Sequence, residues 1–323
     1  MATSPPVTPG QAGVWLAVTA LRPVSATVLA VTLADPAGGP LPAWDPGAHI
    51  DVVLPNGLVR QYSLCGDPTD GTSYQVAVLR DPHSRGASTY VHSELSPGDR
   101  IEVRGPRNHF ALVDAPHYAF VAGGIGITPI VPMITTLEAR GAHWSLLYIG
   151  RARSSMAFLD DLERYGPRVT VLETGGCGRP ELGKLLDARQ PGAAVYACGP
   201  ESLLAAVEHE AADWPPSTLH VERFVPRPDP LPAPAGAFEV HLTETGLTLT
   251  VPAEKSILDV VEEAGIQHPY SCREGTCGTC EVSIVSGEAE HRDSVLTPEE
   301  QQENTHMMIC VSRARSGRIE LAI

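Results

Sequence analysis

Short apolar runs separated by turn residues fill the first third of the chain. The expected strands are rich in Val and Leu, end at Gly, Pro or Asp, and cover residues 14–21, 26–34, 49–54, 59–64, 74–79 and 100–103. Many short strands at even spacing are typical of a closed antiparallel sheet. We therefore predict an antiparallel β-barrel over residues 13–113.

The hydrophobic period changes near residue 114. Apolar strand-like runs at 118–122, 145–149, 169–172 and 194–197 alternate with stretches of helical period. This alternation is typical of a parallel sheet with covering helices. Residues 114–226 are therefore expected to form an α/β domain with a parallel sheet.

A proline-rich segment follows the α/β region. Residues 225–236 carry five prolines and can bury little surface, so a semi-rigid linker is expected at 227–236. Beyond it, residues 237–323 predict an α+β domain. Its expected elements are a hairpin at 238–243 and 247–251, a helix capped by Ser256 that runs to Ala264, and strands at 282–285, 307–311 and 319–323.

Four of the seven cysteines fall in this last domain. Cys272, Cys277 and Cys280 have the C-x4-C-x2-C spacing, and Cys310 follows after 29 intervening residues. This is the ligand pattern of a plant-type 2Fe-2S cluster. Glycines in the loop would let it wrap closely and point backbone N–H groups at the sulfurs. The alternative, a four-thiolate zinc site, usually uses two close pairs of cysteines.

The formal net charge of −15 argues against a nucleic-acid partner. The acidity is concentrated in residues 237–323, where 15 Asp and Glu face 6 Lys and Arg, a balance of −9. Such a domain could steer a basic partner or simply remain soluble. Because the sequence has neither a membrane-spanning apolar run nor the start of a signal peptide, we expect a cytoplasmic protein without membrane contact.

A polar motif lies on one expected barrel strand. Strand alternation places Arg60, Tyr62 and Leu64 on one face, and Gln61 and Ser63 on the other. A guanidinium can hold a phosphate, an aromatic ring can stack on a planar heterocycle, and a hydroxyl can donate to a ring nitrogen. By itself, the motif is equally compatible with an ordinary strand that carries a surface arginine.

A glycine turn closes the first strand of the α/β region. Residues 121–129 end a strand, turn at Gly124 and Gly126, and open a helix for which we expect Thr128 as N-cap and Pro129 as the first residue. That arrangement suits the pyrophosphate of a dinucleotide. It differs from the G-x-G-x-x-G fingerprint and is only moderately specific.

Two further glycine turns carry candidate binding residues. Arg85-Gly86-Ala87-Ser88 leads into a helix start that could bind an anion, and a capped helix without a ligand is its alternative. Cys198-Gly199-Pro200 closes a later strand of the same parallel sheet. It lies at the carboxyl edge, where such sheets bind ligands, although a plain strand-to-helix turn would look the same.

Taken together and in this order, the motifs resemble the phthalate dioxygenase reductase family, a branch of the ferredoxin-NADP reductase superfamily. Its members have an FMN-binding barrel, a nicotinamide domain and a C-terminal plant-type ferredoxin domain of the β-grasp fold. The resemblance begins near Gly13, and the matching segments are 60–64, 85–88, 105–110, 123–129, 198–200, 222–224 and the four cysteines.

The resemblance implies roles for individual residues. Arg60 would hold the FMN phosphate, Tyr62 would pack on the isoalloxazine, and Ser63 would lie near its reactive nitrogen. The rest of the implied FMN set is Leu64, Arg85, Gly86, Ser88 and the shielding residue Phe224, while Gly124, Gly126, Thr128, Cys198, Gly199 and Pro200 would lie along the nicotinamide nucleotide.

One departure concerns the choice of nucleotide. Family members can carry an acid after the second strand of the nicotinamide domain, where this chain has Arg151 and Arg153. An acid would favour the free 2′-hydroxyl of NADH, whereas arginines can accommodate the 2′-phosphate of NADPH. The sequence leaves both nucleotides open.

The cofactors implied by the resemblance define a function. Nicotinamides release two electrons together and a 2Fe-2S cluster accepts one, so a flavin is needed between them. The implied partner is a Rieske-type aromatic oxygenase or demethylase, or a haem-thiolate monooxygenase, served by a monomeric reductase. Two alternatives are a flavin dehydrogenase with its own organic substrate and a redox sensor whose cluster controls docking to a regulator.

Overall fold

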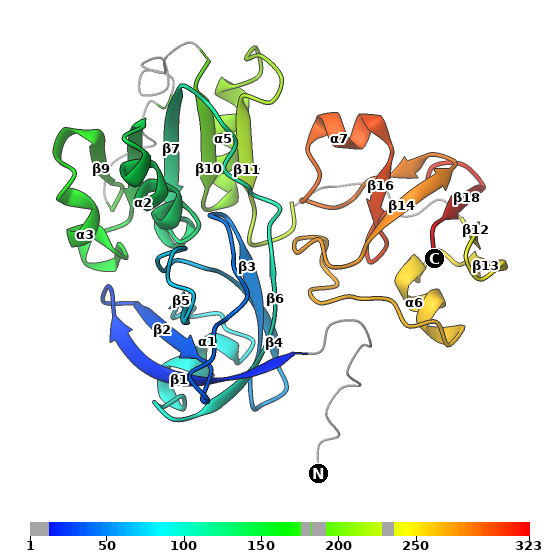
Figure 1. Cartoon of the computed structure of the whole chain (residues 1–323). Coiled ribbons are helices and arrows are strands. Elements are labelled where there is room, and N and C mark those ends of the chain that lie inside the picture. Colours follow the sequence, from blue (N-terminus) through cyan, green and yellow to red (C-terminus); the bar gives the residue numbers. More distant parts are fainter. Residues whose placement is uncertain (1–12, 176–181, 183–191, 228–235) are drawn as a thin grey trace. The chain divides into compact units, whose positions relative to one another are not determined.

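The computed structural model describes residues 13–175, 182, 192–227 and 236–323. The chain divides into two compact units, Gly13–Glu222 and the part that begins at Arg223 and ends at Ile323. Figure 1 shows the elements of both units. Most of the linker expected at 227–236 lies outside the described residues. None of the described helices is long and apolar enough to cross a membrane.

The first unit begins with the antiparallel barrel that the sequence predicts. Its strands are β1 (Val14–Pro23), β2 (Val28–Ala34), β3 (His49–Val53), β4 (Val59–Ser63), β5 (Ser73–Leu79) and β6 (Arg100–Arg107), and α1 (Ala87–Ser93) lies between β5 and β6. They pair in the order β4-β3-β6-β1-β2-β5. A bridge between Leu64 and Val76 joins the two end strands and closes the sheet.

The barrel core consists of every second residue along the strands, those whose side chains point inward. Leu16, Val31, Ile50 and Val76 belong to this buried cluster, and Val91 from α1 joins it. Each fully buried side chain of this kind contributes about 1.5–3 kcal/mol. The alternation of apolar and polar positions in the sequence therefore sets which face of β4 looks inward.

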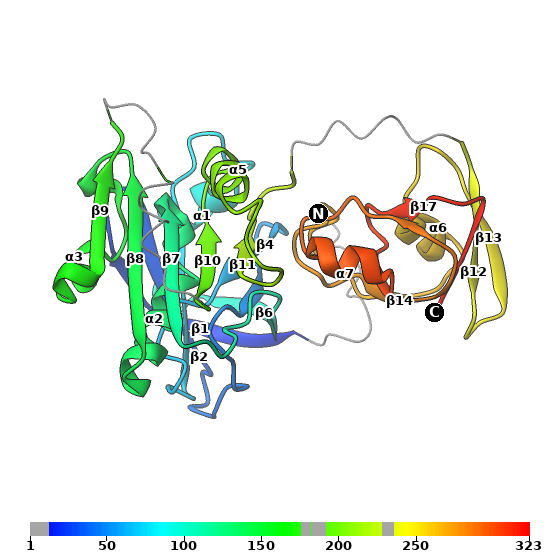
Figure 2. The same cartoon turned by 90° about the horizontal axis from the view of Figure 1, so that it is seen from above.

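A five-stranded parallel sheet forms the second half of the unit, as predicted. Its elements are β7 (His117–Gly123), η1 (Gly124–Ile127), α2 (Ile130–Arg140), β8 (His143–Gly150), η2 (Arg153–Ser155), α3 (Leu159–Glu163), η3 (Gly166–Arg168), β9 (Val169–Glu173), β10 (Ala194–Cys198), α5 (Glu201–Glu210) and β11 (Leu219–Glu222). The strand order is β11-β10-β7-β8-β9. Helix α5 covers one face, and α2 and α3 cover the other (Figures 1 and 2).

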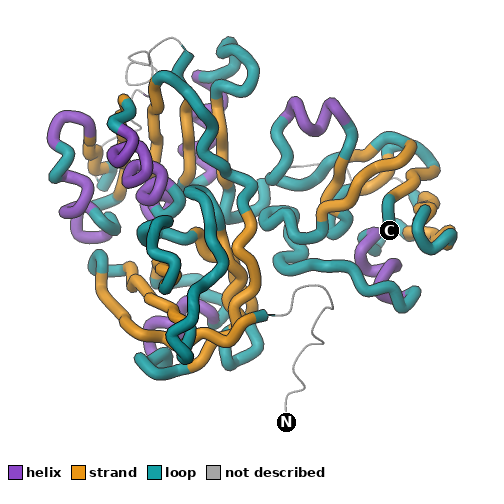
Figure 3. The backbone as a smooth tube through the Cα atoms, in the orientation of Figure 1, coloured by secondary structure: helices purple, strands orange, loops and turns teal. Residues whose placement is uncertain are grey.

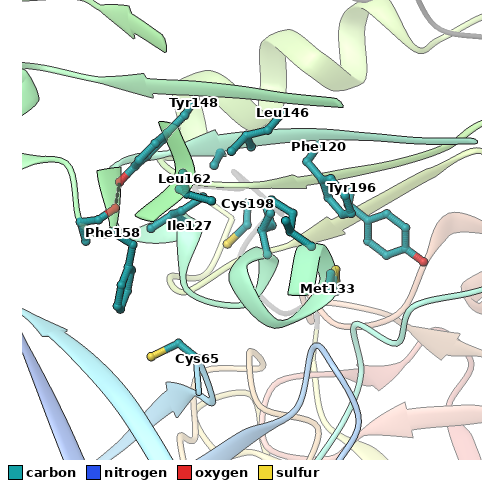
Figure 4. Close-up of a cluster of buried hydrophobic side chains, with 14 of the residues drawn as sticks. Cys65, Phe120, Ile127, Met133, Leu146, Tyr148, Phe158, Leu162, Tyr196 and Cys198 are labelled. Atoms are coloured by element: carbon teal, nitrogen blue, oxygen red, sulfur yellow. Dashed lines mark hydrogen bonds between the residues drawn. The ribbon is translucent and has the colours of Figure 1, made fainter. Parts of the chain in front are cut away.

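The barrel and the parallel sheet share one hydrophobic core. Cys65 and Phe110 from the barrel side pack in the same buried cluster as Phe120, Met133 and Tyr196 from the α/β side (Figure 4). The Tyr196 hydroxyl also donates to Ala111 O at 2.9 Å and accepts from Val113 N–H at 2.7 Å. These contacts hold the sheet against the barrel.

The predicted N-cap of α2 is wrong. Gly124 adopts a φ of 54°, and a 3-10 helix, η1, begins directly at the end of β7. Thr128 follows η1, and its hydroxyl donates to Ile125 O at 3.0 Å. Helix α2 then begins at Ile130 with Pro129 as its N-cap. The 3-10 turn uses the residues that a helical pattern would assign to the start of α2.

The second unit contains the α+β domain predicted for residues 237–323. It contains β12 (Phe238–Leu242), β13 (Leu247–Val251), α6 (Ile257–Glu263), β14 (Glu281–Ser286), β15 (Ala289–Glu290), α7 (Pro298–Glu303), β16 (His306–Met308), β17 (Arg313–Ala314) and β18 (Arg318–Leu321). The main sheet has the order β13-β12-β18-β14-β16, and β15 pairs with β17.

Helix α6 is the principal helix of this domain. As expected, Ser256 is its N-cap and forms a capping box with Asp259. Its apolar residues Ile257, Leu258 and Val261 are buried against the sheet. The strand expected at 307–311 ends early at Met308, because the chain turns with Val311 N–H donating to Met308 O at 3.2 Å.

We predict that Tyr196→Phe lowers the stability of the first unit. The change leaves Val113 N–H and Ala111 C=O without their shared partner, at a cost of about 1–3 kcal/mol. Thermal unfolding followed by calorimetry measures the loss. Tyr165→Phe is the control, since its hydroxyl accepts only from exposed Arg164 at 3.0 Å. Equal melting temperatures for Tyr196→Phe and the control would contradict the prediction.

Candidate functional site

Two loops bring the four cysteines of the expected cluster site together. Cys272, Cys277 and Cys280 lie between α6 and β14, and Cys310 follows β16; Figure 3 shows both segments without helix or strand. Cys277, Cys280 and Cys310 are buried, whereas Cys272 is partly exposed. The loops therefore offer one accessible thiol and three enclosed ones.

Backbone N–H groups of the loop point at the sulfurs. Glu274 N–H and Thr276 N–H donate to Cys272 Sγ at 3.3 and 3.5 Å, and Cys272 N–H donates to Cys277 Sγ at 3.5 Å. The hydroxyl of Thr279 lies 3.3 Å from Cys277 Sγ. Such donors stabilise negative charge on sulfur and the further charge that reduction adds.

The thiols interact with one another in pairs. Hydrogen bonds with Cys277 and then Cys310 hold the pKa of Cys272 well below its usual range. The same contact with Cys272 raises the pKa of Cys277, and contacts with Cys272 and Cys280 raise that of Cys310. The neighbouring thiols thus favour the thiolate form of Cys272.

This arrangement fits a cluster with two metal ions. A 2Fe-2S cluster needs four thiolates divided between two irons. The linked thiols, with backbone donors around them, match that requirement.

A salt-bridge network holds the start of the loop on α6. The guanidinium of Arg273 donates to Asp259 Oδ1 at 2.8 Å and also pairs with Glu262. It lies over the ring of Tyr270, 4.1 Å from the centroid. Arg273 itself has a φ of 55°, a conformation that its surroundings must enforce. The position of neighbouring Cys272 is therefore tied to the helix.

The expected flavin motif lies on β4 with the predicted division of faces. Tyr62 and Leu64 pack against the barrel core, and Arg60 is half-buried beside them. Burial raises the pKa of Tyr62 to about 12, and the charge of Arg60 offsets this only in part. The Tyr62 hydroxyl stays protonated, so the ring remains a neutral surface.

The opposite face of β4 carries an unsatisfied hydroxyl. Ser63 is 5% exposed and lies opposite His49 in the pairing of β3 and β4. Within the described residues, its Oγ forms no hydrogen bond of ordinary geometry, although the carboxyl group of Glu222 lies nearby, whereas neighbouring Gln61 donates to Asp51 at 2.8 Å. Because buried polar atoms are nearly always hydrogen-bonded, Ser63 Oγ fits a ligand nitrogen or oxygen that completes it.

The second flavin motif lies at the start of α1. Gly86 has a φ of 104° and is the N-cap of the helix. Ser88 is buried, and its Oγ accepts from Asp81 N–H at 3.2 Å. Arg85 precedes the turn and is itself engaged in an interaction.

Two glycine turns of the parallel sheet meet at its carboxyl edge. A Cβ on Gly126 would lie 2.3 Å from Cys198 O, and one on Gly199 would lie 2.9 Å from Gly123 Cα. Only glycines allow this close approach. The structure therefore brings the predicted turn around Gly124 and Gly126 against the predicted Cys198-Gly199-Pro200 turn.

A buried acid completes this edge, and the sequence reasoning gave it no role. Glu222 ends β11 and pairs in register with Cys198 at the end of β10. The Cys198 thiol donates towards Glu222 Oε2 at 3.9 Å, and the Ser63 hydroxyl is also near that carboxyl group. Ser63, Cys198 and Glu222 thus meet where barrel and sheet join.

Burial controls the protonation of this group of residues. It raises the pKa of Glu222 to about 8, and the nearby Cys198 and Ser63 lower it only in part. Burial and the adjacent Glu222 raise the pKa of the Cys198 thiol well above its usual value. Near neutral pH, both groups are therefore largely uncharged. An acid at the end of the last strand of a parallel sheet is the signal that could have identified Glu222.

The predicted nucleotide arginines lie after β8. Arg153 pairs with Glu163 on α3, and its backbone N–H donates to Glu173 Oε2 at 3.2 Å. Arg151 is exposed. The remaining predicted residue, Phe224, belongs to the second unit and is 41% exposed.

Comparisons with known proteins identify the class of this chain. Residues 240–315 match the model of the 2Fe-2S iron-sulfur cluster binding domain. A reductase subunit of a putative toluene-4-sulfonate monooxygenase system from Comamonas testosteroni is 42% identical over 97% of this chain and 99% of its own length. The chain is thus an iron-sulfur reductase with a flavin and a nicotinamide half.

The family follows from two further similarities. Phthalate dioxygenase reductase from Burkholderia cepacia is 39% identical over 90% of this chain and 91% of its own length. A solved structure of phthalate dioxygenase reductase covers 96% of this chain and 98% of its own, with 36% identity and a TM-score of 0.70. The chain belongs to the phthalate dioxygenase reductase family, as its motifs indicated.

The same fold also occurs inside a larger enzyme. A solved type IV self-sufficient cytochrome P450 monooxygenase is 44% identical over 96% of this chain, with a TM-score of 0.89. This chain spans 41% of that protein.

We predict that Glu222 makes stability fall as pH rises. Because folding raises its pKa from 4.5 to about 8, the unfolded chain releases this proton first, and the favourable contribution present at pH 4 is lost towards pH 8. The loss is on the order of 4–5 kcal/mol. Melting temperatures from pH 5 to pH 8 should fall less steeply in Glu222→Gln than in the parent. Parallel curves would contradict the prediction.

Proposed function

We propose that this chain takes two electrons from NADH or NADPH at FMN in the barrel and passes them singly through a 2Fe-2S cluster to a terminal oxygenase. The proposed domains are residues 13–113, 114–226 and 237–323. The observation that carries the proposal is that Ser63, on the flavin strand, and Cys198, on the nucleotide turn, both lie beside the carboxyl group of Glu222 in one compact unit. This shared neighbour supports a common site for the two motifs.

The barrel residues would bind and orient the flavin. FMN supplies the capacity to accept two electrons and to release them one at a time. Arg60 would hold its phosphate, Tyr62 would offer a neutral aromatic surface, and the unsatisfied Ser63 Oγ would complete a hydrogen bond with the ring. Leu64, Arg85, Gly86, Ser88 and Phe224 would complete the site, as the family resemblance implies.

The carboxyl edge of the parallel sheet would bind the nucleotide. The paired turns expose backbone N–H groups around Gly124 and Gly126, where a pyrophosphate would lie. Thr128 and the Cys198-Gly199-Pro200 turn would line the nicotinamide. Because burial keeps the Cys198 thiol protonated, it would place no charge beside the ring that donates hydride.

Glu222 would hold and release a proton beside the flavin and nucleotide sites. With a pKa of about 8, its carboxyl group holds a proton near neutral pH and can release it within the physiological range. The neighbouring Ser63 hydroxyl would connect Glu222 Oε2 with the flavin ring. Groups with a pKa near the working pH are the most effective in such proton transfer.

The second unit would carry electrons singly. Cys272, Cys277, Cys280 and Cys310 would hold the cluster, and the N–H groups of Glu274 and Thr276 would stabilise its reduced form. Plant-type clusters have potentials near −400 mV, which suits delivery to an iron oxygenase.

The names of the relatives support an oxygenase as the partner. One relative serves a monooxygenase system and another a dioxygenase, and a third is part of a cytochrome P450. A Rieske-type aromatic oxygenase or demethylase, or a haem-thiolate monooxygenase, fits these neighbours. We propose that it docks transiently at the acidic ferredoxin domain of a monomeric reductase. The cytoplasm would supply the nicotinamide nucleotide and keep the described cysteines as free thiols.

The decisive experiment separates the flavin from the cluster. Replacing Cys272, Cys277, Cys280 or Cys310 by Ser should remove the cluster absorbance and the reduction of cytochrome c. Reduction of ferricyanide by NAD(P)H should persist, because none of the four cysteines belongs to the proposed flavin or nucleotide residues. Cys177→Ser, outside the ligand spacing, is the control. Equal loss of both activities with the flavin still bound would disprove this division.

The choice of nucleotide tests the two arginines. The Arg153–Glu163 pair is exposed, and exposed ion pairs contribute little to stability, so a phosphate can displace the carboxylate. A charged hydrogen bond to the 2′-phosphate is worth about 1.5–3 kcal/mol. If Arg153 reaches it, Glu163→Gln should raise the NADPH to NADH ratio of kcat/KM, and Arg153→Ala should lower it.

Two more variants complete this comparison. Arg151→Ala tests the second arginine, and Arg164→Ala is the control, since Arg164 lies directly after α3 and donates to the Tyr165 hydroxyl. An unchanged ratio in Glu163→Gln, Arg153→Ala and Arg151→Ala would show that neither arginine recognises the phosphate. NADH would then be the expected donor by family resemblance.

A further inference from the structure

The cluster ligands come from two segments that are held together by a third, which contains no cysteine. This third segment, residues 291–296, is a loop between β15 and α7 (Figure 3). Ser294 N–H donates to Gly275 O, inside the cysteine loop, at 2.8 Å. The segment is thus bonded directly to the loop that carries three of the four proposed ligands.

Close packing at Gly275 joins the same three segments. Gly275 has a φ of 69°, and an added Cβ would lie 2.7 Å from Val311 Cγ2 and 3.1 Å from Asp293 Cα. Val311 is the neighbour of Cys310. The cysteine loop, the fourth ligand and residues 291–296 therefore touch at one glycine.

Asp293 is the buried polar centre of this contact. It is 4% exposed, and its Oδ2 accepts from Val295 N–H at 3.1 Å and from Leu296 N–H at 2.8 Å. Its Oδ1 accepts from the hydroxyl of Ser312, which is fully buried, at 3.4 Å. Ser312 Oγ in turn accepts from Arg292 N–H at 3.2 Å. The Asp293 carboxylate thus links residues 293–296 to Ser312, in the loop that follows Cys310.

His291 adds to the polar character of this centre. Its Nδ1 lies 3.8 Å from Asp293 Oδ1, and both ring nitrogens are buried without a hydrogen-bond partner. Burial alone would raise the pKa of Asp293, but the His291 ring and the N–H groups of Leu296 and Val295 hold it below its usual range. Asp293 is therefore a buried carboxylate.

We propose that Asp293 is a positioning residue for the 2Fe-2S cluster, which holds the Cys310 segment against the three-cysteine loop and adds a fixed negative charge to the cluster surroundings. This inference rests on the proposal that the four cysteines bind the cluster. Groups behind the ligands of a metal site set ligand geometry and redox potential. Neither the cysteine spacing nor the fold assigns that task to Asp293.

Variants with different chemistry test the contact in the full-length holoprotein. Gly275→Ala forces a clash with Val311, and Ser312→Ala removes the hydroxyl that bridges to Asp293. The matched control is Gly246→Ala, which has a similar φ of 71° but no atom within 4 Å of an added Cβ. It therefore carries the backbone strain of Gly275→Ala without its clash.

The rate of cluster loss to an iron chelator measures the positioning. Gly275→Ala and Ser312→Ala should lose the cluster about tenfold faster than Gly246→Ala, the effect typical of groups behind metal ligands. Ferricyanide reduction, which depends on the other unit, should be the same in all variants and reports that this other unit is intact.

Asp293→Asn tests the charge with little change in shape. It should raise the midpoint potential of the cluster, because reduction adds negative charge that the carboxylate opposes, and it should alter the electron paramagnetic resonance spectrum of the reduced cluster. A purely structural side chain would move neither. The proposal is overturned if Asp293→Asn keeps the parent potential and Gly275→Ala and Ser312→Ala lose the cluster no faster than Gly246→Ala. A parent chain without a 2Fe-2S spectrum would instead overturn the proposed function.

Discussion

The shared core between the barrel and the parallel sheet is the constraint on which the flavin and nucleotide motifs depend. Each motif alone is an ordinary strand or turn. They become a site because Cys65 and Phe110 are buried with side chains of the sheet, and because Tyr196 bonds to the segment that connects the two halves. With the halves fixed, the end of β4 meets the ends of β10 and β11. A hinge at this boundary would separate Ser63 from Cys198, and hydride transfer depends on reacting atoms held about 3–3.5 Å apart.

The sequence predicts the elements that have a clear hydrophobic period or a characteristic spacing of reactive residues. The barrel and sheet strands follow from apolar runs, and the four cysteines follow from their spacing. Glu222 was missed because β11 (Leu219–Glu222) has only four residues, too few to show a period, and because its carboxyl group is buried only through neighbours distant in sequence. Thr128 was misassigned because a 3-10 turn at Gly124 precedes α2. Helix α7 was missed because none of its residues is buried, so it lacks an apolar face.

The glycines illustrate the same limit. A sequence shows that Gly126 and Gly199 lie in turns, but not that the two turns press against each other. It likewise shows Gly275 between two cysteines, but not that Val311 and Asp293 occupy the space of its missing side chain. In both places, glycine permits contact between segments far apart in the chain. The role of these glycines in turns could be predicted from the local sequence. Their role in close packing could be seen only in the folded structure.

The two redox sites differ in the protonation of the same chemical groups, thiols and carboxyl groups. At the junction of barrel and sheet, burial without strong donors keeps the Cys198 thiol and the Glu222 carboxyl protonated. In the ferredoxin domain, neighbouring thiols and then N–H donors favour the thiolate of Cys272, and the His291 ring together with N–H donors keeps Asp293 ionised. Hydride moves as a two-electron anion and is best received where no fixed anion opposes it. A cluster instead needs thiolates, and its potential falls as fixed negative charge accumulates around it. The hydrogen-bond donors available to each buried group, rather than burial alone, therefore decide which chemistry each unit can perform.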